Sequence, residues 1–292
     1  MDGRIVIHAD DVGMCHGTNK AFVELSHLGA ISAGSVMVPC PWFSEIAAAA
    51  ADDDALDIGV HLTLNAEQQW YRWRPVSQPP ASGGLTDEQG YLWRTVADVR
   101  AKAEPDAVEE EWRAQIELAL ASGIDVTHLD AHMGSALAPE WCERYVALGV
   151  EYGVPALITS TFAGYDPNNH LAGTTHEQFA EFVGSARSAG MPIFGRVLET
   201  DFTRPRGAPT DYQTKLHSTD EELVYCAFHP CRPGPGEVEE IEPGSHHVRV
   251  DEYELFRTDG WLAWLDQQPF EVIGMKGLRD EWQARGAGDA VS

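Results

Sequence analysis

The stretch RIVIHADD, residues Arg4 to Asp11, opens the pattern that decides the fold. Its β-branched and apolar residues predict a buried strand at Arg4–His8, and the amphipathic segment Thr18–Leu28 that follows predicts a helix. Short apolar runs and longer amphipathic segments then alternate along most of the chain. This alternation is typical of βα units arranged around a mostly parallel sheet.

The other expected elements continue this alternation. Further strands are expected at Val36–Val38, Leu56–Leu64, Asp125–Asp130, Ala156–Ser160, Ile193–Leu198, Val224–His229 and Phe270–Met275. Helices are expected at Phe43–Ala51, Asp106–Gly123, Pro139–Tyr152 and His176–Ala189, and from near Asp251. Capping boxes are expected at Asp106 with Glu109 and at Asp251 with Glu254. The helix from Asp106 has an apolar stripe at Val108, Trp112, Ile116, Ala119 and Leu120.

Seven or eight βα repeats without a Ser/Gly-rich linker favour one closed barrel over an open sheet. The expected fold class is therefore α/β, a (β/α) TIM-like barrel, with residues 1–292 forming a single domain and a frayed tail from about Ala284.

The charge balance limits the partners. The 292 residues include 20 Lys and Arg against 46 Asp and Glu, a formal charge of -26, and such a surface repels nucleic acids and anionic lipids. We therefore expect no nucleic-acid partner and no membrane partner, and a neutral or cationic small-molecule substrate rather than a polyanion. The sequence does not decide whether the chain forms a homo-oligomer.

The N-terminus and the cysteines bear on location. No basic and apolar leader precedes Ile5, and no apolar run has the length of a membrane span, so we expect a cytoplasmic protein. The cysteines are odd in number and scattered, which predicts reduced, mostly buried thiols at Cys15, Cys40, Cys142, Cys226 and Cys231.

Polar residues gather where the expected strands end, which is where barrels of this kind place their active sites. Two adjacent carboxylates, Asp10 and Asp11, repel each other unless a cation or hydrogen bonds compensate. Asp11 with neutral imidazoles at His61 and His132 could form a two-His, one-carboxylate cation site. The alternative is that each Asp caps a turn and each His is structural; three such residues at strand ends favour the cation.

His128 and Asp130 share the strand parity of His132, so all three side chains are expected to point inward. His132 lies farther toward the end of the strand and is the better ligand. His128 and Asp130 are expected to orient it, and are also candidates for contacts with substrate.

The segment from Asn65 to Arg94 is long for a barrel loop and rich in aromatic residues. Aromatic faces suit sugar rings, so a substrate-binding role is assigned to Trp70, Tyr71, Trp73 and Trp93. Packing of these rings onto the barrel is the equally weighted alternative.

Several motifs together resemble one family. ADDVG at 9–13, IGVHLTL at 58–64, THLDAH at 127–132 and His229-Pro230 are similar to the YdjC-like carbohydrate deacetylases, which include chitooligosaccharide deacetylases. Supporting matches lie at Asn19 with 29–32, at 85–92 and at 249–252. The resemblance spans nearly the whole chain.

The resemblance implies a distorted barrel that binds one divalent metal ion, Mg²⁺ or Zn²⁺, and hydrolyses the N-acetyl group of amino sugars. It implies that Asp11, His61 and His132 are the metal ligands and Asp10 is the general base. It places a catalytic or oxyanion-facing histidine at His229, which would act as an imidazolium.

Two departures bear on the substrate. The chain reads Met133-Gly134-Ser135 where relatives continue with histidines, and Ile158-Thr159-Ser160 where they often carry arginine. Two alternatives therefore stay open: a metal-dependent barrel amidohydrolase acting on a non-sugar amide or ester, and a carbohydrate-binding protein with a degenerate site.

Overall fold

Seven short strands form one parallel sheet in the computed structural model, which describes residues 3–165, 173–209 and 211–289. They are β1 (Arg4–Val12), β2 (Ala33–Val36), β3 (Ile58–Leu62), β4 (Val126–Ala131), β5 (Arg196–Glu199), β6 (Leu223–Phe228) and β7 (Glu271–Val272). Their order is β4-β3-β2-β1-β6-β5, and β7 pairs with the start of β1.

The segment 155–160 connects the two edges of this sheet. On one side, the Leu129 N–H of β4 donates to Pro155 O; on the other, Ser160 N–H donates to Phe194 O, just before β5. These contacts close a barrel, but Ala156 and Thr159 form only isolated bridges. The parallel α/β fold expected from the sequence is confirmed. The barrel is distorted at the segment 155–160, where a regular strand was expected.

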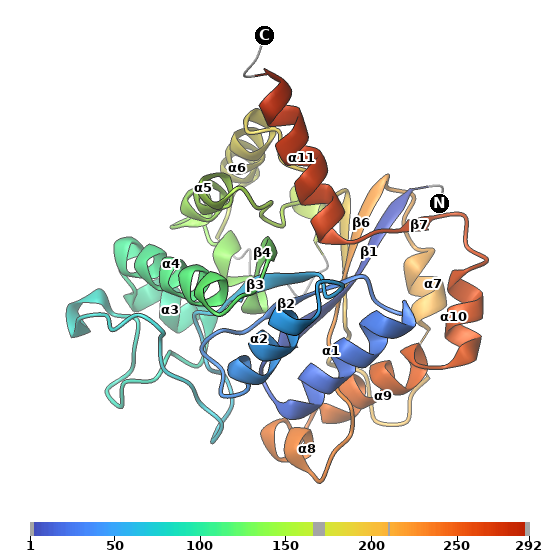
Figure 1. Cartoon of the computed structure of the whole chain (residues 1–292). Helices are drawn as coiled ribbons and strands as arrows, with labels where there is room; N and C mark the ends of the chain where they lie inside the picture. The colour runs from blue at the N-terminus through green and yellow to red at the C-terminus, as the bar shows by residue number, and fades with distance from the viewer. Residues whose placement is uncertain (1–2, 166–172, 210, 290–292) are drawn as a thin grey trace.

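Helices surround the strands (Figure 1). They are α1 (His16–Leu28), α2 (Phe43–Asp52), α3 (Val96–Lys102), α4 (Pro105–Ala121), α5 (Cys142–Tyr152), α6 (His176–Ser188), α7 (Tyr212–Leu216), α8 (Glu237–Ile241), α9 (His246–Phe256), α10 (Asp259–Leu265) and α11 (Met275–Asp289), with 3₁₀ turns η1 (Ala81–Gly83), η2 (His132–Leu137) and η3 (Phe162–Gly164).

Helix α4 shows how local sequence and tertiary packing combine. Its predicted apolar stripe is buried, except that Leu120 is exposed. The capping box expected at Asp106 does not form: Pro105 begins the helix, and the fixed φ of proline suits that position. Asp106 and Glu109 instead accept hydrogen bonds from Arg144 of α5.

The C-terminal region differs most from expectation. The helix expected from Asp251 begins at His246, because the chain already turns there after α8. The apolar run at 270–275 supplies only the two residues of β7, since α11 begins at Met275. This helix continues through Ala284 to Asp289, where a frayed tail was expected. The single-domain organisation stays a prediction.

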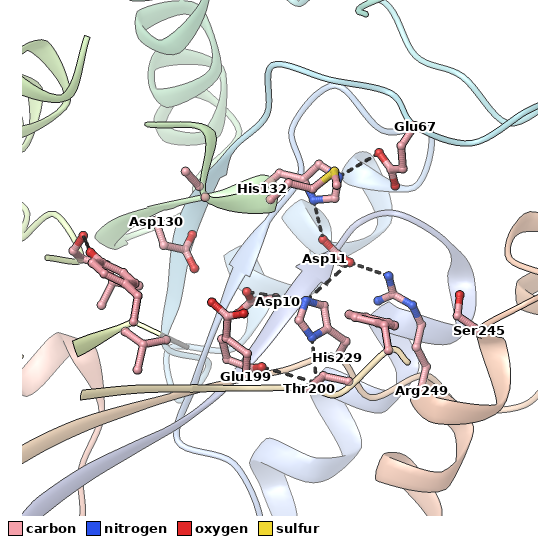
Figure 2. Close-up of a pocket in the computed structure, with 18 of the residues that line it drawn as sticks. Asp10, Asp11, Glu67, Asp130, His132, Glu199, Thr200, His229, Ser245 and Arg249 are labelled. Atoms are coloured by element: carbon pink, nitrogen blue, oxygen red, sulfur yellow. Dashed lines mark hydrogen bonds and ion pairs between the residues drawn. The ribbon is translucent and has the colours of Figure 1, made fainter. Parts of the chain in front are cut away.

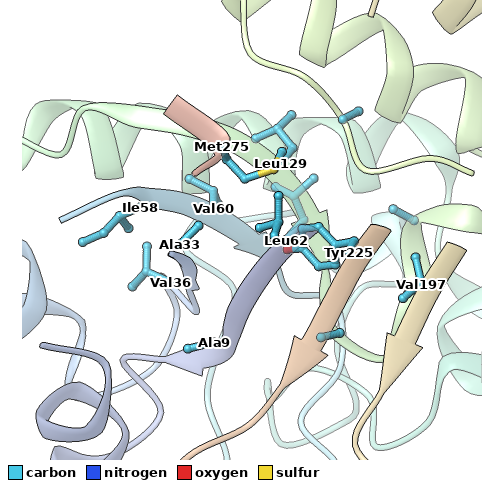
Figure 3. Close-up of a cluster of buried hydrophobic side chains, with 14 of the residues drawn as sticks. Ala9, Ala33, Val36, Ile58, Val60, Leu62, Leu129, Val197, Tyr225 and Met275 are labelled. Atoms are coloured by element: carbon cyan, nitrogen blue, oxygen red, sulfur yellow. The ribbon is translucent and has the colours of Figure 1, made fainter. Parts of the chain in front are cut away.

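The core lies inside the barrel and between the barrel and its helices (Figure 3). Its buried members include Ala9 of β1, Ala33 of β2 and Tyr225 of β6. The five cysteines are buried, as expected. In the described part of the chain, no helix has both the length and the apolar character required to cross a membrane.

Candidate metal centre and catalytic cavity

The carboxyl end of β1 brings two adjacent carboxylates to one cavity. In a regular strand, Asp10 and Asp11 would point to opposite faces. The pairing of β1 with β2 shifts register between Ala9 and Val12, and Asp11 has a φ of 59°. This irregularity re-aims the chain, so that both Asp10 and Asp11 line the same cavity.

Asp11 meets two histidines from other strand ends. Asp11 Oδ1 lies 3.3 Å from His61 Nε2 and 3.0 Å from His132 Nδ1. One ligand atom from each residue lies within 4.8 Å of the other two, and all three side chains are buried. The structure therefore brings together the three residues that the sequence predicted as metal ligands.

Each of these three side chains is also held from outside the cluster; Figure 2 shows this for Asp11 and His132, with their partners Arg249 and Glu67. His61 Nδ1 lies 2.9 Å from Asp130 Oδ1, and His132 Nε2 lies 3.0 Å from Glu67 Oε2. Arg249 donates to Asp11 Oδ2 at 2.7 Å. Metal-binding histidines in proteins commonly have their second nitrogen held by a carboxylate in this way.

Electrostatics in the cluster follow from these contacts. Burial lowers the pKa of both histidines, but neighbouring carboxylates outweigh it: Asp130, Asp11 and Asp10 raise the pKa of His61 well above its usual value, and Glu67 and Asp11 raise that of His132 to about 9.

The opposite balance holds at the carboxylate. Burial raises the pKa of Asp11, but Arg249, His132 and His61 lower it well below its usual value. One carboxylate oxygen and two imidazole nitrogens converge, each already oriented by another residue. The donor set therefore fits a divalent cation.

Asp10 and His229 face each other beside this cluster. His229 Nε2 lies 3.8 Å from Asp10 Oδ2 and 4.0 Å from Asp11 Oδ2. Thr200 donates to Glu252 at 2.6 Å, so its oxygen accepts from His229 Nδ1–H at 2.9 Å. The unprotonated Nε2 of a neutral His229 is thus left facing Asp10.

Burial sets the protonation of this pair. It raises the pKa of Asp10 well above its usual value, which makes Asp10 a stronger base. It lowers the pKa of His229 well below its usual value, outweighing the attraction of Asp11. Burial and the nearby Arg249 thus disfavour, in the resting site, the imidazolium expected at His229, whose role stays a prediction.

The cavity has a volume of about 390 Å³ and two kinds of wall. One wall is formed by acidic and histidine side chains, namely Asp10, Asp11, Glu67, Asp130, His132, Glu199, His229 and Glu242. Another wall is apolar and is formed by Leu137, Tyr145, Leu157, Tyr165 and Val197. The cavity also contacts Met133 and Gly134, where the sequence departs from the family motif.

The four aromatic residues of the long loop are absent from the cavity lining in the described part of the chain. Trp73 is 3% exposed and donates to Asn65 O, and Tyr71 donates to Met14 O at 2.6 Å. Trp93 donates to Gly84 O, with Lys102 stacked on its ring. These three rings hold the loop against the barrel, which favours the packing alternative for them; their contact with substrate stays a prediction.

Trp70 is different, because it is 87% exposed. It follows Glu67 and Gln68, which line the cavity. It is the only one of the four aromatic candidates that presents its ring to solvent near the cavity.

Sequence reasoning missed Glu67 and Glu242, and it noted Arg249 only as part of a weak family match. The Arg249 side chain, 3% exposed, also donates from Nε and Nη2 to Glu242, while its Nη1 has no partner among the described residues. The sequence has no local pattern that identifies these three residues. Glu67 and Glu242 come from loops and Arg249 from α9, rather than from the ends of strands.

His128 does not join the metal ligands. Its Nε2 lies 2.9 Å from His8 Nε2, and His8 Nδ1 lies 2.6 Å from Asp10 Oδ1. Burial lowers the pKa of both His8 and His128 to about 4, despite the nearby Asp130. Asp130 orients His61 rather than His132, to which it was assigned.

A parallel α/β barrel with a buried Asp/His/His centre at the carboxyl ends of its strands defines a class of barrel proteins suited to hold a cation there. The family described as YdjC-like protein matches residues 4–267, and this chain belongs to it.

Relatives give the same grouping. A carbohydrate deacetylase of Thermus thermophilus is 35% identical over 160 residues, 55% of each chain. One from Brevibacillus brevis is 30% identical over 177 residues, 61% of this chain and 68% of the relative. The match thus spans about half of the first relative and two thirds of the second.

A solved structure supports the fold. That of a proposed cellobiose-phosphate cleavage protein from Enterococcus faecalis superposes with a TM-score of 0.73 at 20% identity, covering 95% of this chain and 99% of the other.

Proposed function

We propose that this protein is a metal-dependent carbohydrate deacetylase, a hydrolase that removes N-acetyl groups from amino sugars or oligosaccharides. One observation carries the proposal: Asp11, His61 and His132 converge with their outer atoms already held by Arg249, Asp130 and Glu67. The relatives' names give the substrate class.

Asp11, His61 and His132 would hold one divalent cation, Mg²⁺ or Zn²⁺. When bound, such a cation polarises a carbonyl oxygen and increases the acidity of water. Asp10 takes the proton of the attacking water, because burial has raised its pKa. His229 Nε2, 3.8 Å from Asp10 Oδ2, receives this proton and passes it to the departing amine nitrogen.

Arg249 adds a hydrogen-bond donor. Its Nη1 is buried, has no partner among the described residues, and belongs to a side chain that lines the cavity. A substrate oxygen that gains negative charge during attack is a suitable acceptor. The acidic residues of the cavity favour a neutral substrate over an anionic one.

The remaining assignments concern substrate and setting. Trp70 offers an exposed aromatic face for a sugar ring beyond the acyl group. A cytoplasmic location and the absence of nucleic-acid and membrane partners belong to this proposal.

A second candidate is an amidohydrolase that acts on a non-sugar amide or ester. The apolar wall of the cavity favours it, because Leu137, Leu157 and Val197 can accept a substrate group larger or less polar than acetyl.

Metal analysis of the purified protein, followed by acetate release from a panel of N-acetylated sugars, tests the proposal. We expect one equivalent of metal and release of acetate. Asp10→Asn should keep the metal while kcat falls by about 10²–10⁴-fold. Metal without acetate from any sugar favours the second candidate, and absence of both contradicts the proposed hydrolase.

A further inference from the structure

The cavity has an apolar end, whose lining comes from several elements of the barrel. Its side chains are those of the apolar wall described above, which are Leu137 of η2, Tyr145 of α5, Leu157 and Tyr165 of the segments that follow α5, and Val197 of β5. We propose that this wall binds the acyl chain of the substrate, and that the preferred acyl group is longer than acetyl.

A methyl group is too small to cover this wall. Apolar atoms contact one another only within about 4.5 Å, and the wall extends over side chains from η2, α5 and β5. The cavity has a volume of about 390 Å³, and pockets of roughly 300 Å³ or more take molecules of drug size. An acetyl group would therefore leave apolar surface exposed to water, whereas a chain of several carbons would cover it.

The polar atoms of the wall already have partners. The Tyr145 hydroxyl donates to Leu129 O at 2.8 Å, and the Tyr165 hydroxyl donates to Leu157 O at 3.4 Å. Both phenol hydrogens are thus used within the protein. A sugar hydroxyl placed here would find fewer partners than it has in water, whereas a hydrocarbon chain needs none.

The polar end of the cavity lies on the other side of the proposed cation site. Glu67 and Arg249 lie to one side of that site in Figure 2, and Asp130 lies to the other. The Tyr145 hydroxyl donates to the backbone of the residue before Asp130, so the apolar wall is on the Asp130 side. A substrate carbonyl at the proposed cation site can therefore direct its acyl chain toward the wall while its amine side faces the polar end.

Met133 extends the apolar lining at a cost in backbone strain. Its φ is 52°, and Asp11 is the only other non-glycine residue with a positive φ in the described part of the chain. Both residues line the cavity, and such strain is common at functional sites. The Met133 side chain is 38% exposed, so its burial contributes little to the stability of the fold. The side chain therefore serves the cavity rather than the core.

This inference rests on the proposed function, because it places the acyl carbonyl at the proposed cation site. The reaction is unchanged in kind: water adds its oxygen to the acyl carbon, the C–N bond breaks, and the nitrogen takes a proton, which gives a carboxylic acid and an amine. Glu199 lies two residues beyond Val197 on β5 and lines the same cavity, so a neutral acyl chain is favoured over one that ends in a carboxylate.

Glucosamine that carries an N-acetyl, N-propionyl or N-butyryl group tests the chain length. All three substrates release glucosamine, so one assay measures kcat/KM for each. We expect kcat/KM to rise roughly 3- to 4-fold with each added methylene, because each methylene becomes buried against the wall. A value that stays constant or falls from acetyl to butyryl overturns the inference and leaves deacetylation itself intact.

Val197→Phe tests the wall. The larger side chain occupies the space proposed for the acyl chain, so the ratio of kcat/KM for butyryl over acetyl should fall by roughly 10-fold, the gain expected for two methylenes. Trp70→Ala is the matched control, because Trp70 is not among the described residues that line the cavity, and this variant should keep the wild-type ratio. An unchanged ratio in Val197→Phe contradicts the inference.

Met133→Gly tests the wall without adding bulk to the core. Glycine accepts a φ of 52° without strain, so the melting temperature should not fall. The butyryl-to-acetyl ratio should fall by roughly 2- to 5-fold, because apolar surface is lost. Met133→Leu keeps an apolar side chain and should keep the wild-type ratio. A lower melting temperature with an unchanged ratio in Met133→Gly would show that Met133 only supports the fold.

A binding measurement without turnover separates this inference from the proposed function. Acetohydroxamate and butyrohydroxamate bind metal ions through their oxygens and carry the two acyl chains. Calorimetry on the protein loaded with Zn²⁺ should give a Kd that is roughly 10-fold lower for butyrohydroxamate. That result, together with no hydrolysis of any acylated glucosamine, refutes only the proposed hydrolase. Equal Kd values, or binding of neither compound, overturn the inference even for a protein that releases acetate.

Discussion

Two pairs of histidines lie in the same barrel, and their pKa values are shifted in opposite directions. His132 lines the cavity and His61 lies next to Asp11; each of these two rings lies between two carboxylates, and the pKa of each is raised. His8 and His128 lie deeper and face each other, and burial lowers the pKa of both to about 4. The residue type is the same, so the partner on the ring nitrogens determines whether a histidine is suited to bind a cation or to pass on a hydrogen bond.

His128 and His132 make the comparison sharper, because both come from the region of β4. His128 lies within the strand, and its ring reaches across Gly59 to His8. His132 follows the strand, where η2 begins, and reaches Asp11 and Glu67. His128 and His132 are thus four residues apart in the chain, yet the first lies in the barrel interior and the second in the cluster with Asp11.

Removing a histidine of the Asp11, His61 and His132 cluster should have the largest effect. His61→Ala deletes one of three converging ligand atoms, so bound metal should be lost and acetate release should fall by about 1,000-fold, equivalent to ~4 kcal/mol of transition-state stabilisation. Metal analysis and kcat/KM measure this. Full turnover of the metal-free variant would contradict the assignment of the cluster.

Weakening an outer contact should have an intermediate effect. Asp130→Asn removes the charge that holds His61 Nδ1 and should reduce metal affinity by roughly 10- to 100-fold. His128→Asn is the matched control, because that residue holds none of the three ligands, and its metal affinity should stay at the wild-type value. Equal losses in both variants would remove the distinction between the two pairs.

The two pairs also predict opposite pH dependence of stability in the metal-free protein. For His8 and His128, the folded pKa is lowered, so the unfolded chain binds protons first, and stability falls as pH drops from about 6.5 toward 4. For His132, the folded pKa is raised, so its contribution is present below about 6.5 and is lost as pH rises toward 9.

The free energy of unfolding between pH 4 and 9 measures both slopes, each of which should amount to a few kcal/mol, roughly 1.4 kcal/mol per pKa unit. His128→Asn should flatten only the acid side, and His132→Asn only the alkaline side. A variant that flattens the other side would show that the two pairs are not independent.

The smallest effect is expected at the rim. Trp70→Ala removes an exposed ring that supports no core packing, so KM for a sugar substrate should rise by roughly 2- to 10-fold with kcat and melting temperature unchanged. An unchanged KM for every acetylated sugar would exclude Trp70 from binding. This small change in KM is the reference with which the larger effects of substitutions inside the cavity are compared.

The sequence predicted the parallel barrel and the convergence of Asp11, His61 and His132, because the ends of parallel strands meet on one side of a sheet. It could not predict which atoms hold those ligands. Glu67 comes from a long loop and Arg249 from α9, and their positions depend on tertiary packing rather than on periodicity.

The conformation of Asp11 illustrates a second limit. Its φ of 59° and the register shift in β1 allow neighbouring carboxylates to share one cavity, which strand parity alone forbids. Parity did hold for His128, Asp130 and His132, where the chain is regular, but the partner of each still depended on the opposing strand. The sequence could not decide between packing and substrate binding for the aromatic loop, because both use the same residue types.

The irregular wall at 155–160 gives the barrel a seam. Because Ala156 and Thr159 form only isolated bridges, exchanging residues there disturbs few ladder hydrogen bonds, yet Leu157 of the same segment touches the cavity. The proposed cation ligands lie on β1, on β3 and just after β4, and none of them belongs to the segment 155–160. The proposed ligands and the irregular wall are thus separate segments of the chain. Redesign of substrate preference should therefore begin with residues of the segment 155–160.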